Sequence, residues 1–290
     1  NSLGQSNWFA SHNFNFDYSM VHSADKAVKS SYAGTEWNSV EFSSSFDLAK
    51  RKLSILQRDS KDIDPGKYRV FLSEVAVGEI LGLLSWGGFS LQSQRSKSSS
   101  LNALIEGEEA LDPRITIKEN VIQGACPQFQ SQGFLSPDSI TLIEDGKHAS
   151  SLISPRSSRE YGVENNGAAS YETPSSLDMA GGALDSNEII STLDTGLYIS
   201  NLWYLNYSDR MACRMTGMTR FATFWVENGE VVAPVNVMRF DDTLYSLFGT
   251  ENLQHITKER QFLLSASSYS NRSTESMRLP GVITSMNFTL

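Results

Sequence analysis

Two short patterns in the sequence place a nucleophile beside a group that could activate it. Ser23 and Lys26 have the Ser-x-x-Lys spacing in which a lysine can deprotonate a serine. A chain this rich in serine is expected to contain such a match by chance, so a catalytic role for the pair is only an alternative. Cys213 lies near Arg210 and Arg214, whose charges could lower the pKa of its thiol, but no histidine is nearby in sequence to act as a base. The expected role of Cys213 is that of a small buried hydrophobic residue.

A third pattern combines two carboxylates with small apolar residues in the segment Glu74-Val75-Ala-Val-Gly-Glu79. Residues five apart on an ideal helix point about 140° apart, compared with about 40° for residues four apart, so joint metal ligation would need a π-bulge or a bend. A hard cation would also require more oxygen ligands than this segment offers. We therefore expect contacts with the helix N-terminus or with a partner, and a residual metal site remains an alternative.

Motifs for the common catalytic centres do not occur in the sequence. It contains no HExxH, no glycine-rich phosphate fingerprint, no GxSxG and no EF-hand loop. The four histidines, His12, His22, His148 and His255, are scattered, so a histidine metal site would require three distant segments to converge. No metal and no cofactor are predicted.

Charge and composition limit the possible partners. The 290 residues carry a formal net charge of −9, and no basic run is longer than Lys50-Arg51-Lys52, so nucleic-acid binding is not expected. The most apolar stretch, 75–89, contains Glu79 and is shorter than the roughly 20 residues of a transmembrane helix, so no membrane partner is predicted. Two cysteines without metal-site spacing and the lack of a signal-peptide pattern favour the cytoplasm.

Hydrophobic periodicity and turn residues divide the chain into short elements. The predicted elements are strands and turns over 14–42, a helix over 47–59, a buried strand over 68–72 and an apolar helix over 74–86. Residues 112–186 are predicted to be mainly β with long loops, in which 157–176 is either disordered or a binding loop. Asn228-Gly229 predicts a hairpin within 216–237, followed by a short helix over 241–248 and a last strand over 282–290.

A set of motifs in a fixed order resembles the PmbA/TldD family, whose members are also described as modulators of DNA gyrase. The most telling stretch, 214–235, contains Thr216-Gly217, Glu227-Asn228-Gly229-Glu230 and Pro234-Val235. Three further segments support the resemblance, which spans about residues 12–289: Asp25-Lys-Ala-Val-Lys-Ser-Ser-Tyr-Ala-Gly34, Asp194-Thr-Gly-Leu-Tyr-Ile199, and Leu279-Pro-Gly281 ahead of the final strand.

The resemblance implies a fold and a degenerate site. The TldD branch carries an HExxxH helix and a downstream cysteine; here Glu74 and Glu79 would replace the two histidines, Val75 would replace the general base, and no cysteine follows Cys213. A valine cannot take a proton from a metal-bound water. The chain is thus similar to the PmbA/TldE-like branch, which implies an α+β fold, mainly antiparallel sheet with a few helices. Residues 1–66 would correspond to the end of the family's N-terminal or central region, and residues 67–290 would correspond to its C-terminal domain.

By the same resemblance, the expected function is that of a non-metal partner subunit of a TldD-like protease that helps to hold unfolded peptides for proteolysis or maturation. Main-chain pairing to a sheet edge would hold such a peptide. Phe221, Phe224 and Trp225 could belong to that surface, although the core is their simpler location. Two alternatives remain: a self-sufficient hydrolase that uses Glu74 and Glu79 or Ser23 and Lys26, and a purely structural homodimer.

Overall fold

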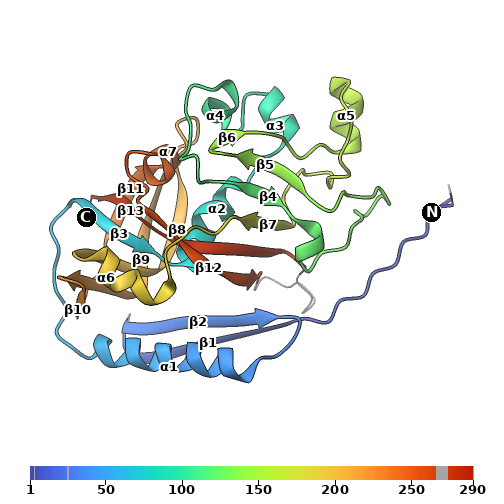
Figure 1. Ribbon diagram of the computed structural model, residues 1–290. Coiled ribbons are helices and arrows are strands. Elements are labelled where there is room, and N and C mark those ends of the chain that lie inside the picture. Colours follow the sequence, from blue (N-terminus) through green and yellow to red (C-terminus); the bar gives the residue numbers. More distant parts are fainter. Residues whose placement is uncertain (3, 25, 266–273, 290) are drawn as a thin grey trace.

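The computed structural model describes residues 1–2, 4–24, 26–265 and 274–289, which Figure 1 traces in sequence order. Its strands are β1 Phe14–Ser23, β2 Lys26–Gly34, β3 Gly66–Leu72, β4 Ile117–Glu119, β5 Ile140–Glu144, β6 Lys147–His148, β7 Ser176–Met179, β8 Gly196–Asp209, β9 Arg214–Glu227, β10 Glu230–Pro234, β11 Arg239–Thr243, β12 His255–Leu264 and β13 Ser276–Phe288. Its helices are α1 Ser39–Leu56, α2 Glu74–Leu84, α3 Leu91–Arg95, α4 Asn102–Glu106, α5 Pro155–Tyr161, α6 Ile189–Leu193 and α7 Leu244–Phe248, with 3-10 turns at Val121–Gln123 and Ser186–Glu188. Parts of the predicted elements and motifs that fall on residues 25 and 290 lie outside the described residues.

A mixed sheet of eleven described strands forms the centre of the molecule. Its strand order is β10-β9-β8-β3-β13-β7-β4-β5-β6, with β11 beside β9 and β13, and β12 beside β13. The pairs β3–β8 and β13–β7 are parallel, and the other neighbours are antiparallel. The predicted α+β fold dominated by antiparallel sheet is confirmed.

Helix α2 packs against β8 and β13 and carries much of the core. Ser73 caps its N-terminus, since its hydroxyl oxygen accepts a hydrogen bond from the Ala76 N–H. The buried residues of the helix include Ala76, Val77, Ile80 and Leu81. Glu74, Val75 and Glu79 are only partly buried, and they form a narrow face of the helix that lies outside this core.

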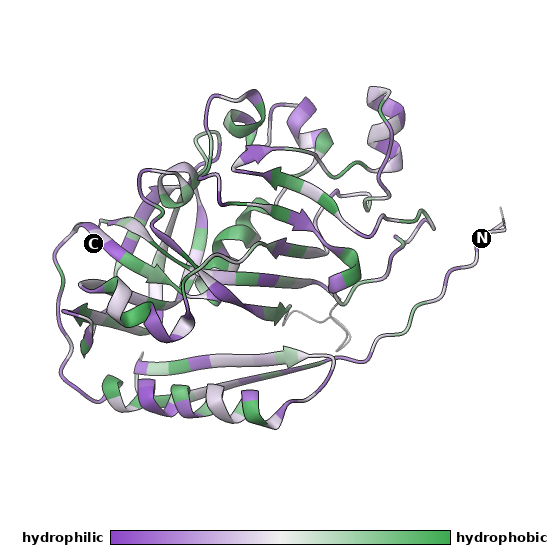
Figure 2. Cartoon of the chain, in the orientation of Figure 1, coloured by the Kyte–Doolittle hydropathy of each residue, from purple (hydrophilic) through white to green (hydrophobic). Residues whose placement is uncertain are grey.

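A smaller layer packs beneath the central sheet in Figure 1 and consists of the β1–β2 hairpin and α1. Ala49 and Leu56 of α1 pack with Val28 of β2 and with Phe224 of β9, so the layer shares a small core with the main sheet. Polar and apolar residues alternate along α1 in Figure 2, as expected of a helix with one packed face. Among the helices that the structure describes, none combines the length and hydropathy that a bilayer crossing requires.

Helix α1 begins eight residues earlier than predicted, so the expectation of strands and turns up to residue 42 is wrong at its end. The Asn38 side chain accepts hydrogen bonds from the Val40 and Glu41 N–H groups and thereby starts the helix. The serine-rich first turns have weak intrinsic helix propensity. Aromatic packing of Phe42 on Trp37, with ring centroids 4.8 Å apart, helps to hold these turns in place.

Two other predicted boundaries are shifted. The helix predicted over 241–248 begins at Leu244, because Asp241 and its two followers pair with β9 in β11. The last strand begins at Ser276, so Leu279-Pro-Gly281 lies inside β13 rather than ahead of it. The β9–β10 hairpin at Asn228-Gly229 is confirmed, and the helix predicted over 74–86 is observed as α2 over 74–84.

The segment 157–176 is ordered and is anchored by one buried glutamate, so the expectation of disorder is wrong. Its first residues belong to α5, whose N-cap is Ser154. The Glu172 carboxylate accepts hydrogen bonds from the Ser90 hydroxyl at 2.6 Å and from the Gln92 and Ser154 N–H groups at 2.9 and 2.8 Å. Burial alone would raise the pKa of Glu172, but the combined hydrogen bonds hold it below its ordinary value. Hydrogen bonds between this buried carboxylate and donors distant in sequence thus anchor a segment that lacks a hydrophobic pattern.

Candidate functional site

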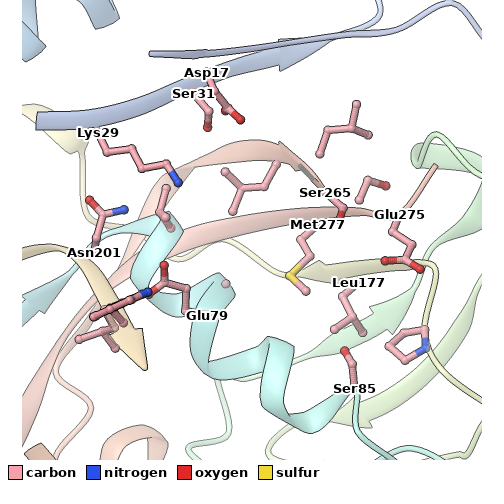
Figure 3. Close-up of a pocket in the computed structure, with 18 of the residues that line it drawn as sticks. Asp17, Lys29, Ser31, Glu79, Ser85, Leu177, Asn201, Ser265, Glu275 and Met277 are labelled. Atoms are coloured by element: carbon pink, nitrogen blue, oxygen red, sulfur yellow. The ribbon is translucent and has the colours of Figure 1, made fainter. Parts of the chain in front are cut away.

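Two cavities lie between α2 and the smaller layer, each of about 690 Å³. Glu79 lines the first, which we call the Glu79 cavity and which Figure 3 shows in close-up. Glu74 lines the second, the Glu74 cavity. Val75 and residues 29–31 of β2 line both. Both volumes fall within the range of roughly 300–1,000 Å³ that is typical of ligand pockets.

The carboxyl group of Glu79 is buried and incompletely paired. Burial raises its pKa to about 7, against the opposing effects of the Leu202 N–H and of the Lys29 ammonium. Its Oε2 atom has no hydrogen-bond partner among the described residues. A buried carboxyl oxygen without a partner is costly, so this atom is a candidate ligand-binding group.

Glu74 faces a different environment. Burial raises the pKa of its carboxyl, Lys52 of α1 lowers it, and Glu259 raises it. Lys52 also lies over the Tyr198 ring, with its Nζ 4.8 Å from the ring centroid. Glu74 therefore faces the helix of the smaller layer, whereas Glu79 lies at the β8 side of α2.

The positions implied by the family resemblance do not fit a metal ion. A catalytic zinc site needs about three protein ligands around one point, and the two carboxylates here line separate cavities. Val75, at the position of the general base, has an apolar side chain. Among the described residues, no group of three His, Cys, Asp or Glu side chains is placed to hold a metal ion.

The family-motif residues of the C-terminal region shape strands rather than either cavity. The Thr216 hydroxyl donates to the Phe240 carbonyl at 2.9 Å, and Gly217 lies against the Phe240 ring, where an added Cβ would come within 2.8 Å of a ring carbon. Thr216 and Gly217 lie near the beginning of β9.

The other motif residues form and flank the hairpin. Asn228 and Gly229 adopt positive φ angles of 51° and 75°, which the tight turn requires, directly after the exposed Glu227. Pro234 is buried and its carbonyl accepts from the Lys61 N–H at 2.8 Å. The structure thus places these residues away from Glu74 and Glu79.

The remaining candidate residues do not assemble a second site. The Lys26 ammonium donates to Asn236 Oδ1 at 3.1 Å and to the Val235 carbonyl at 3.4 Å, so it is occupied away from Ser23. Cys213 is fully buried and burial raises its pKa to about 12, which confirms the expected role as a small buried residue. Phe224 is buried, whereas Phe221 and Trp225 are half-buried.

Several residues that line the Glu79 cavity had no signal in the sequence. Lys29 comes from β2, Asn201 from β8 and Arg220 from β9. The Cζ atom of Arg220 lies 3.7 Å from the centroid of the Trp203 ring. The strands β8 and β9 shift register beyond Ile199 and again beyond Trp203, and Tyr204 and Phe221 have positive φ. These irregularities redirect side chains near the cavity, and hydrophobic alternation does not reveal them.

The molecule is thus a mixed α+β protein in which α2 packs on the central sheet. Its candidate site lies between α2 and the smaller layer, where the two cavities are found. The family model for the PmbA/TldA metallopeptidase C-terminal domain matches residues 65–289. This chain therefore belongs to the PmbA/TldD family, as its motifs indicate.

A curated relative and several solved structures extend the comparison. Metalloprotease PmbA of Escherichia coli O157:H7 is 28% identical over 195 residues, covering 65% of this chain but 39% of that protein, so the match spans about two fifths of its length. The structure of TldE from Thermococcus kodakarensis matches with a TM-score of 0.76 and 15% identity, over 91% of this chain and 59% of that one. A proposed modulator of DNA gyrase from Thermotoga maritima matches with a TM-score of 0.74 and 16% identity, over 95% and 62%. These structures show that the fold is shared.

Proposed function

We propose that this chain is a non-metal partner subunit of a TldD-like metalloprotease and helps to hold unfolded peptides for proteolysis or maturation. The observation that carries the proposal is the division of Glu74 and Glu79 between two cavities, with Val75 between them. These side chains cannot surround one ion and cannot activate a bound water. The cytoplasmic location belongs to the same proposal, supported by two buried free cysteines, and so does the division of the chain at residues 66 and 67.

A peptide-holding role is supported by the edge of β2. This strand pairs with β1 alone among the described strands, so its second edge has main-chain groups to offer an extended peptide. Residues 29–31 of that strand line both cavities, which lie where alternate side chains of a paired peptide would need room. The Gln261 amide already donates to the Ser31 carbonyl at 3.1 Å, which shows that this edge accepts hydrogen bonds.

The test combines assembly, metal content and cleavage. The chain is purified alone and together with a TldD-like subunit that carries an intact HExxxH motif. We expect stable co-purification, zinc bound only when that subunit is present, and chelator-sensitive cleavage of β-casein, used as an unfolded substrate, only by the complex. Glu74→Gln and Glu79→Gln should leave zinc binding by the complex unchanged.

Two outcomes would replace the proposal. Zinc near one per chain in the isolated protein, lost in Glu74→Gln and accompanied by chelator-sensitive cleavage, would establish a self-sufficient metallohydrolase. An isolated homodimer that never exchanges with the TldD-like subunit would favour a structural homodimer.

A further inference from the structure

Three polar side chains from different elements converge at one end of the Glu79 cavity. Lys29 of β2, Asn201 of β8 and Glu79 of α2 point toward one another in Figure 3. Asn201 is only 4% exposed, and its Oδ1 accepts from the Ser200 hydroxyl at 2.9 Å. The Oδ1 atom is therefore the acceptor of this amide and Nδ2 is its donor. The Nδ2 group has no hydrogen-bond partner among the described residues.

The other two groups differ in exposure, because Lys29 is an exposed residue whereas the Glu79 Oε2 atom is buried. In the described part of the chain, Lys29 has neither an ion pair nor a hydrogen bond, and Glu79 Oε2 is buried without a partner. Buried polar groups are nearly always hydrogen-bonded in folded proteins. Of the three groups, only Glu79 Oε2 is both buried and unpartnered among the described residues, and its place in a cavity beside the Lys29 ammonium and the Asn201 amide makes this point a candidate contact for a ligand.

The cavity is lined by two basic and three acidic residues, and the basic residue Lys29 lies at this end. Lys29 and Arg220 are its cationic residues, and Arg220 is held against Trp203. Besides Glu79, the cavity is lined by Asp17 of β1 and by Glu275, which lies at the opposite end in Figure 3. The apolar residues that line the cavity include Leu177, Leu263 and Met277.

We propose that Lys29, Asn201 and Glu79 bind a carboxylate, namely the C-terminal carboxylate of an extended peptide that lies along β2. This inference rests on the peptide-holding function proposed above. The two oxygens of a carboxylate can accept from the Lys29 ammonium and the Asn201 amide, while a protonated Glu79 donates to one of them. The apolar residues that line the cavity then contact the side chain next to the terminus.

The titration of Glu79 predicts how binding depends on pH. Below its pKa of about 7 the neutral carboxyl can donate to the ligand, and above it the ionised carboxylate repels the ligand. Among the charged residues that line the cavity, Lys29 and Arg220 oppose that repulsion, whereas Asp17 and Glu275 add to it. If the ligand binds only to the neutral form, the affinity should fall about tenfold between pH 6 and pH 8.

The test measures binding of three short peptides to the 290-residue chain by calorimetry. The peptides are acetyl-Leu-Ala-Leu with a free C-terminus, the same peptide as its amide, and acetyl-Leu-Glu-Leu-amide, which carries its carboxylate on a side chain. We expect the free acid to bind at least tenfold more tightly than either amide at pH 6. Lys29→Met should remove that preference, and Lys147→Met, at an exposed lysine on β6, should keep it. Glu79→Gln should retain the preference but lose its pH dependence.

The possible outcomes separate this inference from the function it rests on. Equal binding of acid and amide, or an unchanged preference in a folded Lys29→Met variant, overturns the carboxylate site while peptide holding stands. Binding of the acidic side chain as tightly as the free terminus overturns the choice of ligand. Failure of all three peptides to bind, despite assembly with a TldD-like subunit, overturns the site and the peptide role but leaves the partner role. Circular dichroism of each variant verifies that it is folded.

Discussion

Replacing Glu79 by glutamine should change how the stability of the protein depends on pH. Burial raises the pKa of this carboxyl from 4.5 to about 7, so the folded chain holds the proton more tightly than the unfolded chain does. Below pH 4.5 the group is protonated in both states and makes no difference. As pH rises from 4.5 to 7, the unfolded chain ionises first and the wild type loses stability. Above pH 7 the group is ionised in both states, and the loss of stability does not increase further.

The size of the effect follows from the two pKa values. A difference between 4.5 and about 7 corresponds to a total loss of about 3 kcal/mol in the free energy of unfolding, of which about 2–3 kcal/mol falls between pH 5 and pH 8. Glutamine has a similar shape and does not ionise, so the variant lacks this loss. Between pH 5 and pH 8, the free energy of unfolding of Glu79→Gln should therefore rise by about 2–3 kcal/mol relative to that of the wild type.

Urea unfolding followed by tryptophan fluorescence at pH 5, 6, 7 and 8 measures this difference. All other titrating groups are shared, so subtraction of the two curves isolates Glu79. Glu164→Gln, at an exposed glutamate outside both cavities, is the matched control and should follow the wild type. A difference between wild type and Glu79→Gln that is constant across pH would refute the reasoning, because it would show that the buried carboxyl ionises as it does in the unfolded chain.

Three further predictions concern the fold around the site. Gly217→Val should lower the free energy of unfolding by about 1–3 kcal/mol in urea, because its Cβ would clash with the Phe240 ring; an unchanged midpoint would contradict that close packing. Glu172→Gln should destabilise by about 2 kcal/mol or more at pH 7, and the difference from wild type should shrink as the pH falls below 4.5 through the lowered pKa; a difference that persists in acid would show that hydrogen bonding rather than charge anchors the segment. Cys213 should resist iodoacetamide in the native protein and react after unfolding in urea, as measured by mass spectrometry; labelling of the folded chain would contradict its burial.

Local sequence signals predicted those elements whose stability is largely local. The apolar run after Ser73 and the Asn228-Gly229 turn each specify their structure within a few residues, and both are observed. The start of α1 could not be read in this way, because a serine-rich segment is helical here with the support of the Asn38 cap and of aromatic contacts between Phe42 and Trp37. Tertiary packing outweighs propensity at that point.

The candidate site was predictable only at its centre. The helix spacing predicts that Glu74 and Glu79 point in different directions, and they line different cavities. Lys29 and Asn201 could not be associated with Glu79 from the sequence, because they lie 50 residues before it and 122 residues after it. Only the pairing of β8 in the central sheet and the packing of β2 beneath it bring the three together.

The contrast between two glutamates separates a structural carboxyl from a functional one. Glu172 and Glu79 are both removed from solvent, but Glu172 is surrounded by donors that lower its pKa, whereas Glu79 has an unpartnered Oε2 and a raised pKa. A leucine at position 79 would avoid the cost of about 3 kcal/mol that the glutamate imposes near neutral pH. The hydrogen bond from the Leu202 N–H gives one structural reason for a carboxyl at this point of α2, but it leaves the Oε2 atom without a partner among the described residues. The position of this carboxyl opposite Lys29, in a cavity large enough for a ligand, supplies a second reason, since the same group that destabilises the empty site becomes a hydrogen-bond donor when a carboxylate is bound.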